Sequence, residues 1–187
     1  MSAAATARTI ARILKVNHAG EYGAIRIYRA QRLVAGWWLK DLEPFLAETL
    51  SHEITHCRRF LEAMPERRTR PCAAMPLWGL GGFALGLLTG LMGRNAVMVC
   101  TRAVEQAVHR HLDDQQHFLA GLDEPLRRMI ADIQVEENQH LTYAAARVRP
   151  AWYNGLLEAV IVASTEAVIW LSTQGAVSRM EKAIRRS

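Results

Sequence analysis

The sequence predicts an all-α protein, built as an antiparallel bundle of helices with additional apolar helices. Apolar residues recur at helical spacing along most of the chain, and no segment alternates with the two-residue period of a strand. Alanine, leucine, arginine and glutamate favour helices, and most of the six prolines lie between the periodic segments. The length of 187 residues, 50 % of them hydrophobic, predicts a single domain over residues 1–187 with a core of its own.

The first half of the chain predicts a helical hairpin followed by a break. Apolar periodicity covers residues 5–35 and 40–64, and the two segments meet near AGWWLKD. The stretch MPERRTRPCAAMP (64–76) then contains Pro65, Pro71 and Pro76, which disfavour a continuous helix.

The second half predicts three more helical segments. An apolar stretch over residues 77–93 runs on into a helix that ends near Gly121. A helix over 125–147 begins with a proline in its first turn and ends before Pro150. A final, very apolar helix covers residues 152–182.

The apolar stretch could interact with a membrane. Residues 71–93 include no charged side chain, and this stretch is long enough for a transmembrane helix. Pro76 interrupts it, however, and LWGLGGFALGLLTGLMG retains six glycines. A membrane span, a helix in the membrane interface and a buried core helix all stay open. Trp78, Phe83 and the leucines, with basic residues beyond both ends, favour the interface.

Charge and cysteine content narrow the class of protein. The net charge is +5, and two basic clusters could meet nucleic acid or anionic lipid, or form a solvated face. The three cysteines lack close spacing, and the N-terminal segment lacks the apolar core of a signal peptide, so we expect an intracellular bacterial protein. The clusters comprise Arg58, Arg59, Arg67, Arg68 and Arg70, and Arg179, Lys182, Arg185 and Arg186.

A repeated pattern of glutamates and histidines predicts a metal site. SHEITHC provides Glu53 and His56, and VEENQHL provides a second Glu-x-x-His in the other half of the chain. A lone glutamate precedes each motif, and the interval from the lone glutamate to the motif is the same in both halves. One such pair is common on a solvated helix, but repetition of the whole pattern at one spacing favours a site. The six residues are Glu21, Glu53, His56, Glu105, Glu137 and His140.

Helix geometry explains the spacing. Residues three apart lie on one helix face, so the glutamate and histidine of each motif can reach one point. Antiparallel neighbours bring each lone glutamate level with a motif. Four carboxylates and two imidazoles are the ligand set of ferritin-like di-iron and di-manganese proteins, and two divalent ions would balance their charge. No cysteine belongs to the set, which argues against structural zinc.

Neighbouring residues support an inward orientation of the six. Among the other histidines, His18 precedes Glu21 by one turn and could orient a ligand, whereas His111 could face a cavity. We expect His52 and His117 to be exposed and Cys57 to serve in packing. The apolar residues expected on the ligand faces are Ile25, Tyr28, Leu46, Leu50, Phe60, Ile130, Ile133 and Ala144.

Several motifs resemble the demethoxyubiquinone hydroxylase family of coenzyme Q biosynthesis. They are VNHAGEYGAIRIY, EITH, MPLWGLGGFALG, VEQAVHRH and VEENQH, and the resemblance covers residues 8–172. It implies a ferritin-like four-helix bundle that carries two iron ions, with the same six ligands. It also implies that His111 lies near the substrate pocket. This chain departs from the family at Leu112, where eukaryotic relatives tend to have tyrosine, and at Glu166, where a basic residue is usual.

The resemblance also implies an activity and its partners. A monooxygenase of this family hydroxylates the ring of demethoxyubiquinone (2-polyprenyl-3-methyl-6-methoxy-1,4-benzoquinone) with dioxygen, and the electrons come ultimately from NADH. The polyprenyl tail would follow the 77–93 helix and the last helix into lipid. If 77–93 crossed the bilayer, Glu53 and Glu105 could not share a centre, so we expect peripheral binding at the cytoplasmic face of the bacterial inner membrane.

Other interpretations stay open at this point. The chain could be a quinone hydroxylase of different regiospecificity, a di-manganese enzyme that decomposes peroxide, or an iron-binding or storage protein. It could also be a membrane-surface adaptor without chemistry. We expect no nucleic-acid partner. A homo-oligomer or an accessory lipid-binding protein is compatible with the sequence.

Overall fold

The structure, a computed structural model, describes residues 2–173 and Gly175. These residues form six α-helices and two short 3-10 helices with no strand among them, which confirms the all-α prediction. The elements are α1 (Ala3–Trp38), η1 (Lys40–Leu42), α2 (Glu43–Glu62), η2 (Pro65–Arg67), α3 (Met75–Met92), α4 (Arg94–Leu119), α5 (Glu124–Ala145) and α6 (Asn154–Thr173).

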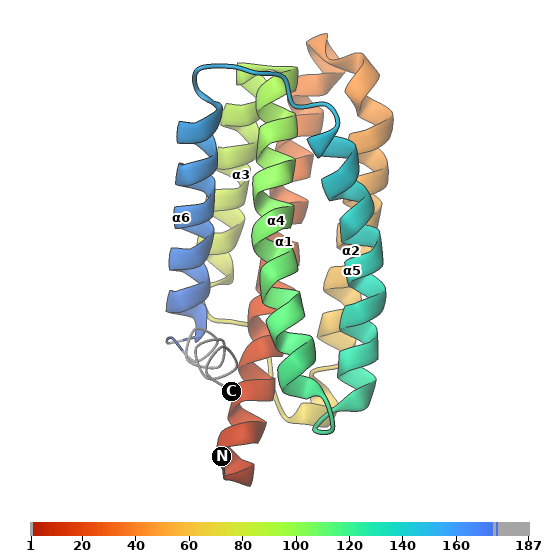
Figure 1. The fold of residues 1–187 in the computed structure, drawn as a ribbon, viewed down its shortest axis with the longest axis vertical. Coiled ribbons are helices and arrows are strands. Elements are labelled where there is room, and N and C mark those ends of the chain that lie inside the picture. Colours follow the sequence, from red (N-terminus) through yellow and green to blue (C-terminus); the bar gives the residue numbers. More distant parts are fainter. Residues whose placement is uncertain (1, 174, 176–187) are drawn as a thin grey trace.

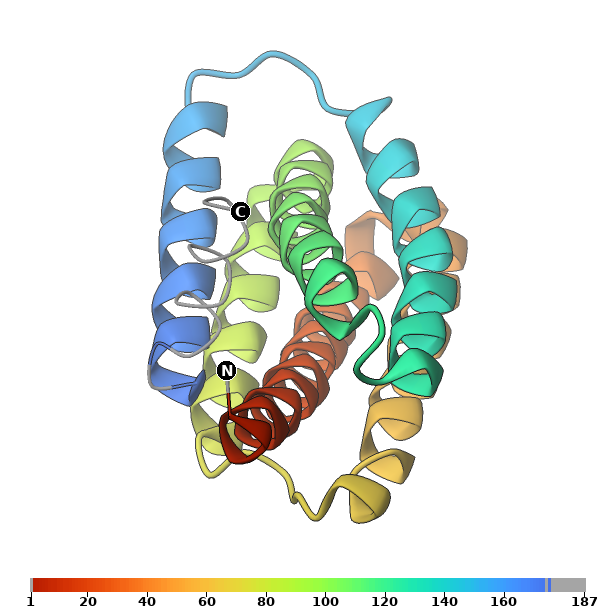
Figure 2. The same ribbon diagram turned by 60° about the horizontal axis from the view of Figure 1, so that its bottom comes forward.

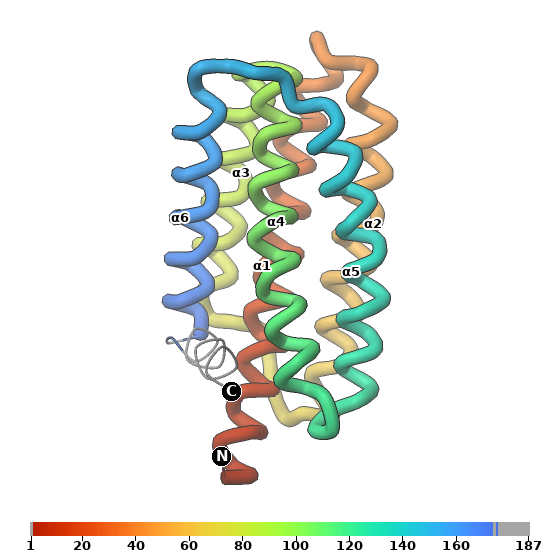
Figure 3. The backbone as a smooth tube through the Cα atoms, viewed as in Figure 1, coloured from red at the N-terminus to blue at the C-terminus, as the bar shows by residue number. Residues whose placement is uncertain are grey.

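The helices form three layers of two. Successive helices run in opposite directions along the long axis (Figures 1 and 3). Viewed toward one end, α1 and α4 lie in the middle, with α3 and α6 on one side and α2 and α5 on the other (Figure 2). The antiparallel hairpins α1–α2 and α4–α5 therefore make up a four-helix unit, and α3 and α6 cover one of its faces.

The observed helix boundaries differ from the predicted ones in two places. The apolar stretch does not continue into the next helix, because Gly93 has a φ of 97° and separates α3 from α4. A backbone in this left-handed region suits glycine. The last helix is described as far as Thr173, and residues 174 and 176–182 of the predicted segment lie outside the described residues. The break between the helices is confirmed at Pro65 and Pro71, whereas Pro76 lies in the first turn of α3.

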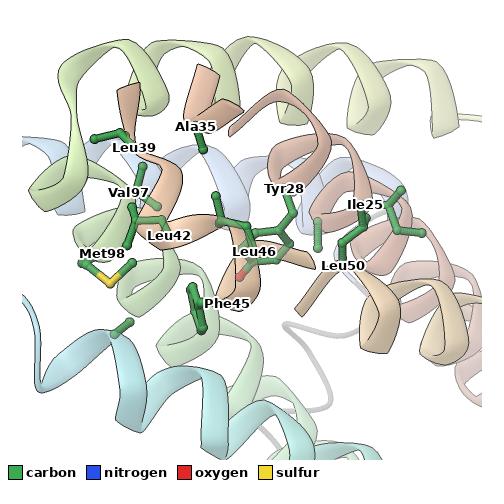
Figure 4. Close-up of a cluster of buried hydrophobic side chains, with 12 residues drawn as sticks. Ile25, Tyr28, Ala35, Leu39, Leu42, Phe45, Leu46, Leu50, Val97 and Met98 are labelled. Atoms are coloured by element: carbon green, nitrogen blue, oxygen red, sulfur yellow. The ribbon is translucent and has the colours of Figure 1, made fainter. Parts of the chain in front are cut away.

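Apolar clusters pack on both sides of the middle of the bundle. One joins α1, α2 and the start of α4, where Tyr28 and Leu46 are almost completely buried (Figure 4). Another lies toward the opposite end and includes Phe60, Ile130 and Ile133. All eight apolar residues expected on the ligand faces are buried. Each large side chain removed from water contributes about 1.5–3 kcal/mol, so these clusters hold the four-helix unit together.

Helix α3 packs closely on α1 through its glycines. A Cβ atom at Gly82 would lie 2.4 Å from the carbonyl oxygen of Gly23, and one at Gly86 would lie 2.2 Å from that of Ile27. No side chain fits at these distances, so the two backbones can approach only because both residues are glycine. The glycine-rich composition of the stretch is therefore a packing surface.

The opposite faces of α3 and α6 are apolar and exposed. Both helices are long and apolar enough to cross a membrane by length and composition, with mean hydropathy 1.4 and 1.5. Only 28 % of α3 and 17 % of the apolar part of α6 are buried, so neither is an ordinary core helix. The large exposed residues are Leu77, Leu80, Leu87, Leu88, Leu91 and Met92 on α3, and Leu156, Val160, Trp170 and Leu171 on α6.

The first basic cluster is partly neutralised by nearby acids. Arg67 binds Asp123 through two hydrogen bonds of 2.6 and 2.8 Å, which ties the segment after α2 to the start of α5. Arg58 and Arg59 lie 3.8 and 3.3 Å from acidic side chains. These pairs leave a mixed surface, which is consistent with a solvated face. The second cluster, at residues 179–186, lies outside the described residues.

Candidate metal centre

The structure brings all six predicted residues together in the middle of the four-helix unit. α1 and α4 each contribute one glutamate, and α2 and α5 each contribute one Glu-x-x-His motif. In each of two groups of four, the candidate ligand atoms lie within 4.8 Å of one another. All six residues are buried, and His56 is completely inaccessible. The groups are Glu21, Glu53, His56 and Glu137, and Glu53, Glu105, Glu137 and His140.

The two groups overlap in a way that suits two metal ions. Glu53 and Glu137 belong to both groups, so each could contact two ions at once. Each group also has one histidine and one glutamate of its own. Oxygen and nitrogen ligands of this kind suit iron or manganese.

Burial and mutual repulsion disfavour the ionised form of most of these carboxylates. Burial, followed by the charge of Glu137, raises the pKa of Glu21 to about 7. The same two causes raise the pKa of Glu53 and Glu105 well above the usual range. Without cations, the cluster can therefore hold its full negative charge only at a high cost in free energy.

The histidines outweigh the effect of burial at one carboxylate, that of Glu137. Burial opposes its ionisation, but contacts with His140 and His56 lower the pKa of Glu137 below its ordinary value. Burial likewise opposes protonation of His56, but Glu137 and Glu21 raise its pKa to about 9. His56 Nδ1 lies 2.8 Å from Glu137 Oε1, yet the two atoms are not aligned for a hydrogen bond.

Several polar atoms in the cluster lack a hydrogen-bond partner. Glu53 Oε1, Glu137 Oε1 and His56 Nδ1 are buried without one among the described residues. Buried polar atoms in folded proteins nearly always have a partner. These orphaned atoms, together with the donor types, fit a pair of bound divalent ions.

Three further residues contact the cluster from outside, and the sequence interpretation missed their roles. His52 was expected to be exposed, which is wrong: its side chain is 29 % exposed, and its Nδ1 lies 3.0 Å from His140 Nε2. Glu136 Oε2 lies 3.2 Å from His56 Nε2, and the Tyr28 hydroxyl donates a 2.9 Å hydrogen bond to Glu105. The only signal in the sequence was the position of His52 and Glu136, each directly before a motif glutamate.

The remaining histidines separate into different environments. His117 is exposed, as predicted. His18 is buried and its Nδ1 has no hydrogen-bond partner within the described part of the chain, so the expected orientation of a ligand stays a prediction. Burial lowers the pKa of His18. Cys57 is half-buried and its thiol lies 3.7 Å from the His18 carbonyl, which agrees with a packing role.

A cavity of about 320 Å³ leads from the cluster toward α3 and α6. Its lining includes four of the glutamates and a larger number of apolar side chains, such as Leu85, Val108 and Val168. His111 also lines it, and its Nε2 lies 3.1 Å from Glu166 on α6. The cavity thus joins a charged inner end to the apolar outer layer.

The two residues that depart from the family pattern, Glu166 and Leu112, both lie close to the cavity. Glu166 bridges α6 to His111 on α4, and it also lies 3.8 Å from Arg110. Leu112 is buried in the apolar cluster that includes Phe60 and Ile130, and it also lines the cavity, where a tyrosine would add a hydroxyl.

The arrangement defines the class of this protein. Four antiparallel helices that direct four glutamates and two histidines to one buried centre form a ferritin-like bundle whose central residues could hold two metal ions. Comparison with known families then identifies the particular one: the model for "Ubiquinone biosynthesis protein COQ7" matches residues 8–172. The chain belongs to this family, and the resemblance predicted from the motifs is confirmed.

Two curated relatives are similar over most of their length. A mouse protein named "NADPH-dependent 3-demethoxyubiquinone 3-hydroxylase, mitochondrial" is 38 % identical over 168 residues, covering 86 % of this chain and 76 % of the mouse protein. A Rhodospirillum rubrum protein named "3-demethoxyubiquinol 3-hydroxylase" is 38 % identical over 169 residues, covering 89 % and 78 %. A relative from Variovorax paradoxus with the same name as the latter is 31 % identical over 134 residues, covering 71 % and 62 %.

Proposed function

We propose that this chain is a hydroxylase of ubiquinone biosynthesis that acts on the ring of demethoxyubiquinone, or of its quinol, with dioxygen. The observation that carries the proposal is the buried cluster of carboxylates and imidazoles at the inner end of an apolar cavity. Such a cavity suits a flat, largely apolar ring, and the cluster suits the chemistry of oxygen activation. The hydroxylase names of the family relatives support the same activity.

The six residues would hold two iron ions. Glu53 and Glu137 belong to both groups of ligand atoms, so they would take part in holding both ions. Glu21 with His56 would complete one position, and Glu105 with His140 the other. Bound iron would supply the electrons and the binding site for dioxygen that the side chains cannot supply.

The surrounding residues position the ring and keep water out. The apolar walls disfavour water beside the ring, and His111 is the cavity residue that we assign to the substrate pocket. Only 7 % of its surface is exposed, and its contact with Glu166 restricts the orientation of the imidazole. A fixed imidazole can form a hydrogen bond with an oxygen substituent of the ring.

The tail of the substrate would leave the cavity toward α3 and α6. These two helices line the cavity and also carry the exposed apolar face, so an apolar tail can pass from the site to lipid without crossing water. Close packing of α3 on α1 argues against a span, because α1 carries Glu21 and extends along the same direction. We therefore assign peripheral binding through α3 and α6, at the cytoplasmic face of the inner membrane.

The reductant is a nicotinamide cofactor. The motifs led us to expect NADH as the ultimate donor, whereas the name of the mouse relative specifies NADPH. The assay must therefore include both.

Product analysis tests the proposed function. The purified chain is loaded with iron under anaerobic conditions, mixed with demethoxyubiquinone and NADH or NADPH, and then exposed to dioxygen. We expect the hydroxylated quinone with one added oxygen atom from ¹⁸O₂. Metal-loaded protein that forms no such product with either donor would contradict the assignment, and Glu53→Gln serves as the inactive control.

Metal analysis separates the proposal from its alternatives. Two irons in each active chain support the oxygenase, whereas activity on peroxide with manganese supports a di-manganese enzyme. A protein without metal would support an adaptor. Iron storage is disfavoured by the exposed apolar faces of α3 and α6, because a soluble shell requires polar contacts.

A further inference from the structure

The two histidines of the metal centre are supported by chemically different residues. His56 Nε2 lies 3.2 Å from a carboxylate oxygen of Glu136, whereas His140 Nε2 lies 3.0 Å from the imidazole Nδ1 of His52. The His52 and His140 rings are nearly parallel, at 20°, with centroids 5.2 Å apart. The support crosses between α2 and α5: each supporting residue precedes the motif glutamate of one helix and contacts the histidine of the other.

The orientation of each imidazole determines the effect of its contact with Glu136 or His52. His56 and His140 both direct Nδ1 toward the carboxylates, with His140 Nδ1 lying 3.3 Å from Glu137. A metal ion on Nδ1 leaves the proton on Nε2, which then donates to the outer partner. Donation to an anionic carboxylate makes an imidazole a stronger ligand than donation to an uncharged nitrogen does.

The two lone glutamates, Glu21 and Glu105, also differ in their hydrogen bonds, and this difference again makes the group with His140 the weaker set of ligands. Tyr28 donates its hydroxyl proton to Glu105 over 2.9 Å, and both side chains are buried. In the described part of the chain, no hydroxyl donates to Glu21. A hydrogen bond to a carboxylate oxygen stabilises its charge and reduces its basicity toward a metal ion. The group with Glu105 and His140 is therefore the weaker donor set on two independent counts.

We propose that the two metal positions are unequal, and that the position of Glu21 and His56 binds a divalent ion more tightly than the position of Glu105 and His140. Glu136 is the positioning residue that creates most of the difference. The inference rests on the proposed metal centre and extends it to the order in which the centre is filled. Loss of an outer partner typically weakens metal binding by about 10–100-fold, which sets the expected size of the difference.

The arrangement of Glu136 and His52 makes this inference testable. Their side chains are 38 % and 29 % exposed, so exchanging them disturbs little of the core. Glu136→Gln keeps the shape but removes the charge, and His52→Glu places a carboxylate behind the other histidine. Circular dichroism melting of the metal-free variants checks that the fold is intact.

The experiment determines which of the two positions is filled when only one ion is supplied for each chain. Metal-free crystals of the protein are soaked with Co²⁺ at one ion per chain, and anomalous diffraction at the cobalt edge gives the occupancy of each position. We expect the position at Glu21 and His56 to be occupied about tenfold more than the other. Repulsion between two ions makes the second ion bind more weakly even when the two positions are identical. Two different stepwise affinities therefore do not show that the positions differ, whereas unequal occupancy by a single ion does.

The variants complete the test. In Glu136→Gln the preference should fall to near equality, and in His52→Glu the occupancy at Glu105 and His140 should rise. Equal occupancy in the unmodified protein, or a preference that Glu136→Gln leaves unchanged, overturns this inference alone. Failure of both positions to bind Co²⁺ in the folded protein overturns it together with the proposed metal centre.

Discussion

The four-helix unit of α1, α2, α4 and α5 and the outer pair of α3 and α6 distribute polar and apolar residues in opposite ways. The four-helix unit buries six ionisable side chains at its centre, all of them at most 7 % exposed. In the outer pair, α3 buries glycines, and both helices expose leucines, up to 71 % for Leu80. In ordinary soluble proteins, ionisable side chains are mostly exposed and leucines are mostly buried. The comparison teaches that the two parts suit different surroundings: the inner cluster suits cations, and the outer face suits an apolar phase such as lipid.

The two outer helices are attached to the unit by different means. α3 contacts α1 through backbone approach at its glycines. α6 packs on α4 through the buried side chains of Leu157 and Ile161. Polar contacts add to this: Arg102 with Glu158 at 2.8 Å and His111 with Glu166 at 3.1 Å join α6 to α4, and Trp78 with Ser172 at 2.9 Å joins it to α3. The two outer helices therefore depend on different contacts: close backbone approach for α3, and side-chain packing with polar contacts for α6.

The largest expected effect comes from the shared glutamates. Glu137→Gln removes a candidate ligand of both ions and leaves His56 without its closest negative charge. We expect metal affinity to fall by more than about 100-fold, which exceeds the usual effect of an outer partner. Metal content after dialysis and hydroxylase activity measure this. Glu124→Gln changes a partly exposed acid in the first turn of the same helix, and this control should retain both.

The exposed leucines of α3 should determine membrane binding. The triple change Leu80→Ser, Leu88→Ser and Leu91→Ser removes side chains that each contribute about 1.5–3 kcal/mol when they enter an apolar phase. We expect binding to phospholipid vesicles, measured by flotation, to weaken by at least about 100-fold.

A matched control uses leucines that are exposed outside the outer pair. Leu33, Leu61 and Leu122 lie on α1, on α2 and after α4, with exposures of 63, 44 and 53 %. Changing all three to serine should leave flotation unaltered. Equal losses in the two triple variants would show that the outer face has no special role.

The glycine contact between α3 and α1 should tolerate no side chain. In Gly86→Ala the new Cβ would meet the Ile27 carbonyl oxygen at 2.2 Å, so the helices must separate. Overpacking of this kind costs about 1–3 kcal/mol in the free energy of unfolding, measurable by urea denaturation. Gly81→Ala, on the same helix but with nothing within 4 Å of the new Cβ, should be neutral or stabilising by up to about 1 kcal/mol.

The metal-free protein should lose stability as the pH rises. Burial raises the pKa of Glu21 from 4.5 to about 7, so the folded state holds a proton that the unfolded chain releases. This contribution is fully present below pH 4.5 and is lost between pH 4.5 and 7, and the raised pKa values of Glu53 and Glu105 act in the same direction.

The pKa of His56, raised to about 9, extends the loss of stability to higher pH. Its contribution is present below pH 6.5 and disappears through pH 9. We expect a lower melting temperature at pH 8 than at pH 5.5 without metal, with the difference reduced or reversed by Fe²⁺ under anaerobic conditions. A melting temperature that is independent of pH in the metal-free protein would argue against a carboxylate cluster of this burial.

The smallest expected effect concerns Glu166. Glu166→Gln removes the charge that faces His111, and the loss of such a hydrogen bond, worth about 0.5–1.5 kcal/mol, should lower kcat/KM by roughly 2–12-fold. Glu158→Gln breaks another tie between the same two helices, through Arg102, away from the cavity. If both variants lower kcat/KM equally, Glu166 acts only by holding α6 in place.

The sequence by itself determined the helices and the six residues of the candidate centre. Periodicity and prolines located the helices because both act within a few residues of the chain. The ligand positions could be read because helix geometry relates Glu53 to His56, and the recurrence of the same spacing at Glu105 and Glu137 relates the two halves.

Tertiary structure alone decided what meets these residues. The contacts of His52 with His140, of Glu136 with His56 and of Tyr28 with Glu105 join residues 77 to 88 positions apart. Local patterns assign a residue to a helix face, but the partner on another helix depends on the rotation and register of packing. For the same reason, the sequence showed that residues 77–93 are apolar and rich in glycine, whereas only packing against α1 showed that four of the glycines face inward and most of the leucines outward.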